Sequence, residues 1–555
     1  MPPDAAPTPV PAEATNADTA RPRLNYRQRR YLTRMAAKMA RAYISSVWPA
    51  NYREAMNRED AKQWEQAMQA EYESIMRNNV WTLVPRPANV KVVKTRWVLR
   101  IKDNGRYKAR FCAKGFTQRW GEDYDETFAP VAKYNSIRTL FALMAGRKGA
   151  KVHQMDVNTA FLYSPLSEEV YIEQPEGLEL PGKENWVCKL NRALYGLKQS
   201  PRAWFSLIAP TLVNFDFQQC EADSCIFVHT NDKGEKTYIA LYVDDFLIAG
   251  ENEDDIATIK GLLAERFEMK DLGIAEKFLG MEIEYGEDGS VKLHQEGYLW
   301  NLLKRHGMQD CNPISTPLDT SVKLTKATDA EPLANSKEYA SIVGGLMFAA
   351  CVTRPDIMCA VGQLSQFLNK PTSRHLLAAK RILRYLKGTL NLGIRYGHPV
   401  TPLVGFSDAD WAGNLDTRRS TTGYVVMLNN GAVTWRSQRQ PTVALSTMEA
   451  EYMALTEATK ELLWMRRFLT ELGYGNDDPV DLFTDNQSAL ALSKNPVSHA
   501  RAKHIDVRHH FVRDAIQDNV VWVQHIPTEN IIADSLTKAL GREKHWRCTT
   551  HMGMC

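Results

Sequence analysis

Two adjacent carboxylates inside an apolar stretch place the strongest constraint on how this chain folds. Residues 237–249 read TYIALYVDDFLIA, and Asp244 and Asp245 are the only charged side chains among them. Burying an unpaired carboxylate is costly, so these acids require a cation or an exposed position. Because side chains alternate along a strand, the two acids cannot face the same way unless a turn intervenes. We therefore predict a tight hairpin at Val243-Asp244 that presents both acids at its tip.

A third acid completes the first candidate site. Asp156 lies in the segment HQMDVNTAFL at residues 153–162. If a neighbouring strand carries it, three carboxylates can hold two Mg²⁺ ions about 4 Å apart. Such a pair of ions promotes in-line attack of a 3′-hydroxyl on a nucleotide α-phosphate. The alternative for each aspartate alone is a turn residue, but that alternative does not explain two acids within an apolar segment.

A second set of acids lies in the C-terminal third of the chain. Its members are Asp408, Glu449, Asp485 and Asp534. Each has an alternative explanation: Asp408 opens a turn, Ser446-x-x-Glu449 forms a capping box, and the other two are helix N-caps. Four acids at strand ends and helix starts within one small α/β segment favour a single metal site. Hydrolysis of a phosphodiester by two metal ions uses such a ring of carboxylates.

The pattern of apolar residues predicts several domains in the 555 residues. In the N-terminal part we expect a helix near 64–76, paired strands at 92–101 and 106–113, and amphipathic helices at 256–267 and 374–387. In the C-terminal part we expect strands at 403–407, 423–428 and 432–436, a helix over 447–472, and a strand that ends at Asp485. The second order of elements predicts a separate α/β domain.

Charge and cysteine content exclude several other classes of protein. The net charge of +4 does not by itself indicate a nucleic-acid-binding protein. Residues 1–53 combine a Pro-rich start with a basic run at 21–41, and we expect a disordered linker that either contacts nucleic acid or only connects. The nine cysteines include no C-x-x-C pair, which disfavours a zinc knuckle and fits a reducing compartment. The chain shows no signal peptide, and its longest apolar run, 341–352, is too short to span a membrane.

Many short motifs occur in one consistent order along residues 54–545. In the first part they are WTLVPRP (81–87), YKARFCAKGFTQ (107–118), QMDVNTAFL (154–162), LYGLKQSPRAW (194–204) and LYVDDF (241–246). In the last part they are SDADWAG (407–413), STMEAEY (446–452), TDNQ (484–487) and ENIIADSLTKA (529–539). In this order they resemble the reverse transcriptase and ribonuclease H region of copia-type LTR retrotransposon Pol polyproteins.

The resemblance implies a fold and a division into domains. The fold is an α+β right-hand polymerase of fingers, palm and thumb, followed by a connection and an α/β ribonuclease H-like domain. We expect fingers and palm over 54–300, thumb and connection over 301–400, the ribonuclease H-like domain over 401–545, and a C-terminal tail over 546–555.

The resemblance also implies roles for particular residues. Asp156, Asp244 and Asp245 are the polymerase acids, and the four C-terminal acids belong to the ribonuclease H, with Asp410 as an alternative to the first of them. The expected nucleotide-binding residues are Lys108, Arg110, Phe161, Gly196, Lys198 and Ser200. Phe161 would exclude the sugar 2′-hydroxyl, and its alternative is a core aromatic. The alternative for Lys108 and Arg110 is a solvated hairpin. Tyr195 stands where retroviral relatives have Gln.

The activity implied by the resemblance is RNA-directed DNA synthesis with degradation of RNA in the RNA–DNA hybrid. The cofactor is Mg²⁺, or Mn²⁺ in its place. The partners are an RNA template, a DNA primer, the hybrid and dNTPs, together with integrase and capsid of the same element, and no membrane. The expected location is a virus-like particle in the cytoplasm, or the nucleus, without secretion. The alternative function is an inactive or domesticated relic that only binds nucleic acid.

Overall fold

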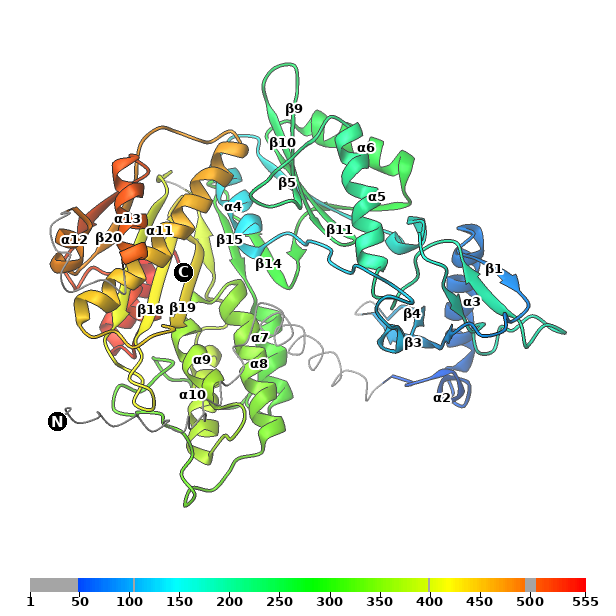
Figure 1. The fold of residues 1–555 in the computed structure, drawn as a ribbon, viewed down its shortest axis with the longest axis horizontal. Helices are drawn as coiled ribbons and strands as arrows, with labels where there is room; N and C mark the ends of the chain where they lie inside the picture. The colour runs from blue at the N-terminus through cyan, green and yellow to red at the C-terminus, as the bar shows by residue number, and fades with distance from the viewer. Residues whose placement is uncertain (1–47, 103–104, 398–399, 495–505) are drawn as a thin grey trace, which may run out of the picture.

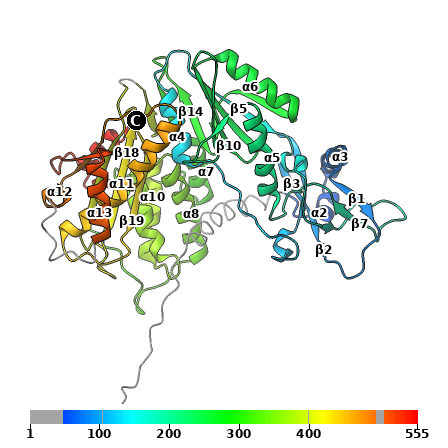
Figure 2. The same cartoon turned by 45° about the horizontal axis from the view of Figure 1, so that its top comes forward.

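The structure is a computed structural model that describes residues 48–102, 105–397, 400–494 and 506–555. Most of the predicted N-terminal linker, and two residues of the hairpin predicted after residue 101, lie outside the described residues. Figure 1 shows the fingers on the right, the palm at the top, a group of helices below it and the C-terminal domain on the left. Figure 2 shows the same arrangement from another side.

The fingers have their own apolar core between helices and short sheets. Their elements are α2 Tyr52–Met56, α3 Ala61–Arg77, β1 Trp81–Val84, β2 Val92–Val93, β3 Thr95–Ile101, β4 Tyr107–Ala113, β6 Tyr171–Ile172 and β7 Val187–Leu190. On α3, Trp64 and Met68 lie one turn apart and are buried, and they belong to the same core as Phe111 of β4. The helix α3 confirms the helix predicted near 64–76, and the antiparallel β3–β4 hairpin confirms the paired strands predicted at 92–101 and 106–113.

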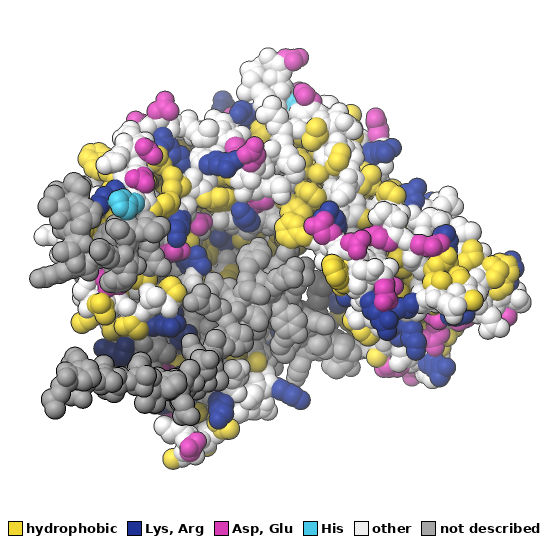
Figure 3. Space-filling model, in the orientation of Figure 1, with side chains coloured by type: hydrophobic (Ala, Val, Ile, Leu, Met, Phe, Trp, Pro, Cys, Tyr) yellow, Lys and Arg dark blue, Asp and Glu magenta, His cyan; other side chains and the backbone are white. Residues whose placement is uncertain are grey.

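Figure 3 shows Lys and Arg side chains gathered on one face of the fingers, over β3, β4 and the neighbouring α2. The strands contribute Arg96, Arg100, Lys108 and Arg110. This basic face is a local feature that the small net charge of the whole chain conceals.

The palm is a six-stranded sheet in the order β12-β5-β11-β10-β9-β8. Its strands are β5 Lys151–Val157, β8 Gln218–Gln219, β9 Ile226–Thr230, β10 Lys236–Tyr242, β11 Asp245–Gly250 and β12 Met269–Ile274. Its helices are α4 Tyr134–Met144, α5 Ser200–Asn214 and α6 Glu253–Arg266. The strands β10 and β11 are antiparallel neighbours joined at Val243-Asp244, so the predicted hairpin is confirmed.

The next unit begins earlier in the chain than predicted. Its sheet has the order β13-β14-β15-β16, from β13 Lys277–Phe278, β14 Met281–Tyr285, β15 Val291–His294 and β16 Ile394–Tyr396. Its helices are α7 Glu296–Arg305, α8 Ser336–Val352, α9 Met358–Leu364 and α10 Ser373–Lys387. Because β15 pairs with β16 across about a hundred residues of chain, strands from 277 onward belong with this unit, and the boundary predicted at 300/301 divides it.

The apolar run near residue 341 lies within α8, which is mostly buried between other helices. In the described part of the chain, no helix combines the length and the apolar character that crossing a membrane requires. The nine cysteines, all in described segments, are free thiols.

The C-terminal domain is a five-stranded sheet with helices against it. The order is β19-β18-β17-β20-β21, with β17 parallel to β20 and β20 parallel to β21. Its elements are β17 Val404–Asp410, β18 Thr421–Leu428, β19 Gly431–Arg439, α11 Thr447–Glu471, β20 Val480–Thr484, α12 Gln487–Lys494, α13 Asp506–Gln517, β21 Val521–His525, η7 Ile532–Leu536 and α14 Arg542–His551. The predicted strands, the long helix and the strand before Asp485 are all present.

The last residues are an integral part of the fold, which corrects the predicted tail over 546–555. Cys548 and Met552 of this segment are buried. The backbone of Cys555 exchanges two hydrogen bonds with Gly393, at 3.0 and 3.1 Å, and so ties the chain end beside β16. The sequence did not indicate this packing, because the partner of the segment, Gly393, lies about 160 residues earlier in the chain.

One buried arginine joins three parts of the molecule. Arg138 of α4 donates from Nε to the carbonyl of Val433 in β19 at 2.8 Å, and from Nη1 to the carbonyls of Cys351 and Val352 in α8 at 3.0 and 2.9 Å. Its guanidinium lies 4.0 Å from the ring centroid of Trp435. Palm, helical unit and C-terminal domain therefore share one continuous core.

A second buried cation organises the helical unit. Arg354 and Asp356 are both fully buried and form an ion pair at 2.7 Å. Tyr385 of α10 donates to the same carboxylate at 2.7 Å, and its hydroxyl lies 3.0 Å from Nε2 of His545 in α14. Although burial opposes ionisation, the ion pair holds the pKa of Asp356 below its usual value. The network therefore fixes the C-terminal helix to α10.

We predict that Arg354→Met lowers the free energy of unfolding by about 3–5 kcal/mol, because it leaves Asp356 buried without its counter-charge. Urea unfolding followed by circular dichroism measures the loss. The matched control is Arg384→Met, since that half-buried side chain donates to the carbonyl of Asn312 and forms no ion pair with an acid among the described residues. Equal unfolding midpoints for the two variants would contradict the prediction.

Candidate active sites

The backbone at the end of β10 holds the first pair of acids in place. Val243 has φ +61°, an uncommon conformation for a β-branched residue. Trp204 of α5 donates from Nε1 to the carbonyl of Val243 at 2.6 Å, and the amide of Val157 donates to the carbonyl of Asp244 at 2.9 Å. The strained turn persists because the buried Trp204 of α5 and the neighbouring strand β5 both donate hydrogen bonds to its carbonyls.

The third acid lies beside this turn. Asp156 is the cross-strand partner of Asp245 in the β5–β11 register. Burial, with the nearby Asp244 and Asp156 carboxylates, raises the pKa of Asp245 to about 7. Burial and Asp244 likewise raise the pKa of Asp156. Because burial and Asp244 disfavour the charged forms of Asp156 and Asp245, a divalent cation beside them would stabilise these acids, and their carboxylate oxygens are ligands of the kind that suits Mg²⁺.

Two cations from the fingers face these acids. On β4, Ala109 and Phe111 point into the fingers core, so alternation turns Lys108 and Arg110 to the other side. A terminal guanidinium nitrogen of Arg110 lies 4.0 Å from Oδ2 of Asp244. Burial and Arg110 lower the pKa of Lys108, while Asp156 acts in the opposite direction. Both predicted cations are therefore at the carboxylate site and not on a solvated hairpin.

Phe161 lies near Arg110, because both pack against the ring of Tyr195. It lies in the short helix η2 Ala160–Tyr163, and its ring packs edge-on against Tyr195 with centroids 5.0 Å apart. The guanidinium of Arg110 lies 4.7 Å from the Tyr195 ring centroid. Phe161 is partly buried, so one edge packs against the core and the other remains accessible.

The residues at 196–200 that were predicted to bind nucleotide make their contacts mainly with neighbouring protein groups. Gly196 has φ +93°, and a Cβ there would lie 2.2 Å from the carbonyl oxygen of Ala113, so glycine is required for the approach of β4. Lys198 donates from Nζ to the carbonyl of Gln118 at 3.0 Å and to the Tyr124 hydroxyl at 2.9 Å.

Ser200 is fully buried at the start of α5 and donates to the carbonyl of Leu194 at 2.6 Å. Direct nucleotide binding by Ser200 is therefore contradicted, because no part of its side chain reaches solvent. Lys198 supports the segment that carries Tyr195, and it does so through bonds to neighbouring protein groups.

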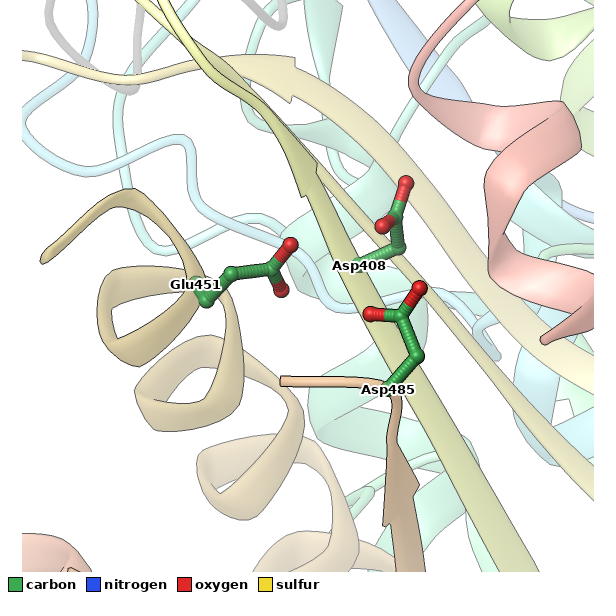
Figure 4. Close-up of side chains that lie close together, drawn as sticks. All are labelled: Asp408, Glu451 and Asp485. Atoms are coloured by element: carbon green, nitrogen blue, oxygen red, sulfur yellow. The ribbon is translucent and has the colours of Figure 1, made fainter. Parts of the chain in front are cut away.

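The second site brings together three acids from three elements. Asp408 lies on β17, Glu451 on α11 and Asp485 directly after β20, and one carboxylate oxygen of each lies within 4.8 Å of the others. In Figure 4 the three side chains point toward one another. Because β17 and β20 are parallel neighbours, their carboxyl ends meet at one edge of the sheet and place both aspartates beside the helix.

Glu449 is not a member of this cluster, which corrects its prediction as a metal ligand. Its Oε2 accepts from the amide of Leu445 at 2.7 Å, and its own amide donates to Oγ of Ser446 at 3.2 Å. Ser446 therefore caps α11 as the capping-box alternative expects, but the Glu449 carboxylate accepts from Leu445, one residue before the cap, and not from the amide of Ser446. The neighbouring acid Glu451 takes the predicted place.

A signal for Glu451 was present in the sequence. Glu451 shares a helix face with Leu455 and Ala458, four and seven residues later, and all three are buried. An acid on the apolar face of a long helix is the same anomaly that marked Asp244 and Asp245. The sequence prediction named Glu449 instead, because Glu449 occupies the last position of the Ser446-x-x-Glu449 motif.

The other predicted acids lie beside the cluster. Asp534, in η7, is fully buried and forms ion pairs with Lys538 and Lys544. The hydroxyl of Thr537 donates to Oδ2 of Asp408. Asp410 accepts from the amide of Thr421, and burial raises its pKa to about 6.

The electrostatics of the second cluster fit a divalent cation. Burial, and then the charges of the other acids, raise the pKa of both Asp408 and Glu451. Oε2 of Glu451 is buried and has no hydrogen-bond partner among the described residues. Oxygen ligands on rigid elements, one with an unused lone pair, are suited to Mg²⁺.

Comparison with known proteins gives one consistent result. The sequence profile of the family described as "Reverse transcriptase (RNA-dependent DNA polymerase)" matches residues 78–320. The chain is 43% identical over 518 residues to a retrovirus-related Pol polyprotein from transposon TNT 1-94 of Nicotiana tabacum, covering 91% of this chain and 39% of that protein. It is 34% identical over 310 residues to a putative transposon Ty5-1 protein of Saccharomyces cerevisiae, covering 56% of this chain and 100% of that protein.

Among solved structures, a foamy viral protease–reverse transcriptase in complex with double-stranded DNA has a similar fold. The TM-score is 0.51 at 14% identity, over 84% of this chain and 70% of that one. At this identity the similarity concerns the fold, and it supports the predicted right-hand polymerase architecture.

We predict that Glu451→Gln weakens divalent-cation binding at the second cluster by at least about tenfold, because it removes one charged ligand at short range. Isothermal titration with Mn²⁺ measures this, in a chain whose Asp244 and Asp245 are both changed to Asn so that the palm acids do not contribute. Glu449→Gln is the matched control and should leave binding unchanged, because Gln preserves the cap. The reverse result would restore residue 449 as the ligand.

Proposed function

We propose the function of this chain from its family, because it belongs to the Pol polyproteins of copia-type retrotransposons and carries their reverse transcriptase region. We propose that it copies retrotransposon RNA into DNA and degrades the RNA strand of the resulting hybrid. The observation that carries the proposal is the arrangement of acids: three adjacent acids at the β10–β11 turn and β5 in the palm, and a separate carboxylate cluster in the C-terminal domain.

At the palm, Asp156, Asp244 and Asp245 would hold Mg²⁺, which when bound activates the primer 3′-hydroxyl and stabilises charge on the reacting phosphate. Arg110 and Lys108 would bind the triphosphate, since a guanidinium presents a fork that matches phosphate oxygens. Phe161 would lie against the sugar. The residues of the chain thus position the nucleotide between cations of the fingers and acids of the palm.

In the C-terminal domain, Asp408, Glu451 and Asp485 would hold a divalent cation, which when bound would assist the attack of water on the RNA phosphodiester. The sheet edge fixes the two aspartates, and α11 fixes the glutamate. This rigidity favours the hydrolysis of a bound phosphodiester, because ligands that are already in place need no rearrangement. This second activity rests on the cluster geometry and on the fold of the domain.

The chain spans about two fifths of the tobacco polyprotein that it resembles, so substrates and partners are proposals as well. The proposed substrates are an RNA template, a DNA primer, the hybrid and dNTPs. Integrase and capsid of the same element are the proposed protein partners, and the proposed location is a virus-like particle in the cytoplasm. Co-sedimentation of the chain with capsid particles tests the capsid partner and the proposed location.

We predict that Asp244→Asn abolishes DNA synthesis and leaves hybrid cleavage within about twofold of wild type. Loss of one ligand from a two-metal site removes several kcal/mol of transition-state stabilisation. Primer extension on poly-rA with oligo-dT measures synthesis, and a labelled RNA–DNA hybrid measures cleavage. Synthesis at the wild-type rate would show that the palm acids are misassigned, and a wild-type chain inactive in both assays would identify a relic.

We also predict that Phe161→Val admits ribonucleotides, because a smaller side chain opens space for a 2′-hydroxyl. The measurement is the ratio of kcat/KM for dCTP to that for rCTP, since specificity is a ratio of such values. We expect this ratio to fall by at least about tenfold, the scale of one lost steric contact. Phe141→Leu is the control, because this ring is fully buried in the palm core. The same ratio in the Phe161 variant and in wild type would make Phe161 a core residue only.

A further inference from the structure

The C-terminal carboxylate cluster has two sides that differ in charge. On one side Asp408 faces Glu451 and Asp485, and in the described part of the chain neither of these two acids forms an ion pair. On the other side Asp408 faces Asp534, and here the basic side chains of Lys538 and Lys544 are present. The Asp408–Asp534 side therefore already has positive charges beside it, whereas the described residues give Glu451 and Asp485 no ion pair.

The ammonium group of Lys538 bridges two of the acids. Its Nζ lies 2.6 Å from Oδ1 of Asp534 and 3.7 Å from Oδ2 of Asp408. Lys538 is four residues after Asp534, so the turn that carries the acid also returns the cation to it. Lys544 contacts the other oxygen of Asp534, and Thr537 donates to Asp408. Two positive and two negative charges thus balance on this side.

This ammonium group lies between two carboxylates, where a second metal ion of a two-metal site would also be attracted. Asp408 and Asp534 are both buried, so each needs a nearby positive charge. A second Mg²⁺ ion close to Lys538 would meet a like charge at short range and low dielectric. The side chain of Lys538 is 41% exposed, so it can move outward into solvent without unfolding its turn.

We propose that Lys538 is the resident cation of the Asp408–Asp534 side, so that the cluster binds one divalent ion tightly and a second one only when the Lys538 side chain moves away. In consequence Lys538 sets the Mg²⁺ concentration that hybrid cleavage requires. It is a positioning residue for the metal ions. The cleavage part of this inference rests on the proposed ribonuclease H function, whereas the metal-binding part does not.

The first test counts metal ions without any reaction. In the chain carrying Asp244→Asn and Asp245→Asn, isothermal titration with Mn²⁺ should show one tight site and a second that is at least about tenfold weaker, because a unit charge lies within 4 Å. Lys538→Met should strengthen the second site by a similar factor. Lys538→Arg keeps the charge and should preserve the parent behaviour.

The matched control is Lys460→Met. Lys460 lies on α11, is about half exposed and pairs with Glu457, so its loss removes one positive charge from the same domain but not from the cluster. Two equally tight sites in the parent chain would overturn the proposal. Identical second-site affinities in the parent and in Lys538→Met would do so as well. If Lys538→Met does not fold, as judged by circular dichroism, the parent titration and Lys538→Arg still decide.

The second test measures hybrid cleavage against Mg²⁺ concentration in the otherwise wild-type chain. Lys538→Met should reach half-maximal cleavage at about tenfold less Mg²⁺ than wild type or Lys460→Met. An unchanged midpoint overturns the link to cleavage. If even the wild type cleaves no hybrid, the proposed ribonuclease H function fails, while the Mn²⁺ titration continues to test the role of Lys538.

Discussion

Repulsion between carboxylates held out of water is the constraint on which the rest of this structure depends. In the palm, burial and the nearby Asp244 carboxylate raise the pKa of Asp156 and Asp245, and in the C-terminal domain burial and neighbouring acids raise the pKa of Asp408 and Glu451. Neither group would assemble by itself, so the backbone must hold it. A left-handed turn at Val243, bonded by Trp204, does this in the palm, and the shared edge of two parallel strands does it in the C-terminal domain.

The two sites balance their charge in different ways. In the palm the cations come from another unit, since Lys108 and Arg110 reach the acids from the fingers. These cations are therefore set apart from the palm acids by the boundary between two units of the fold. In the C-terminal domain Lys538 comes from the same turn as the acid Asp534. Its charge belongs to the same turn as the acid, and the second ion enters only when the Lys538 side chain moves outward.

Buried polar contacts keep the palm and the C-terminal domain together. Arg138 bonds to carbonyls in two other units, and Asn429 donates to the carbonyls of Ala142 and Ala145 at the end of α4, at 2.8 and 3.0 Å. Breaking the interface would leave these donors and acceptors unpaired away from water, which is costly. The two carboxylate sites are therefore held at a set separation.

The sequence by itself determined what depends on neighbouring residues: the hairpin at Val243-Asp244, the helix over 447–472 with its Ser446 cap, and the order of elements in the C-terminal domain. Family motifs added the identity of the palm acids. Only the tertiary structure decided that Glu451, and not Glu449, faces Asp408, that Lys538 lies between Asp408 and Asp534, and that the last ten residues pack beside Gly393. The physical reason is that backbone propensity and capping act over a few residues, whereas a carboxylate's partners are set by strands and helices that meet from distant parts of the chain.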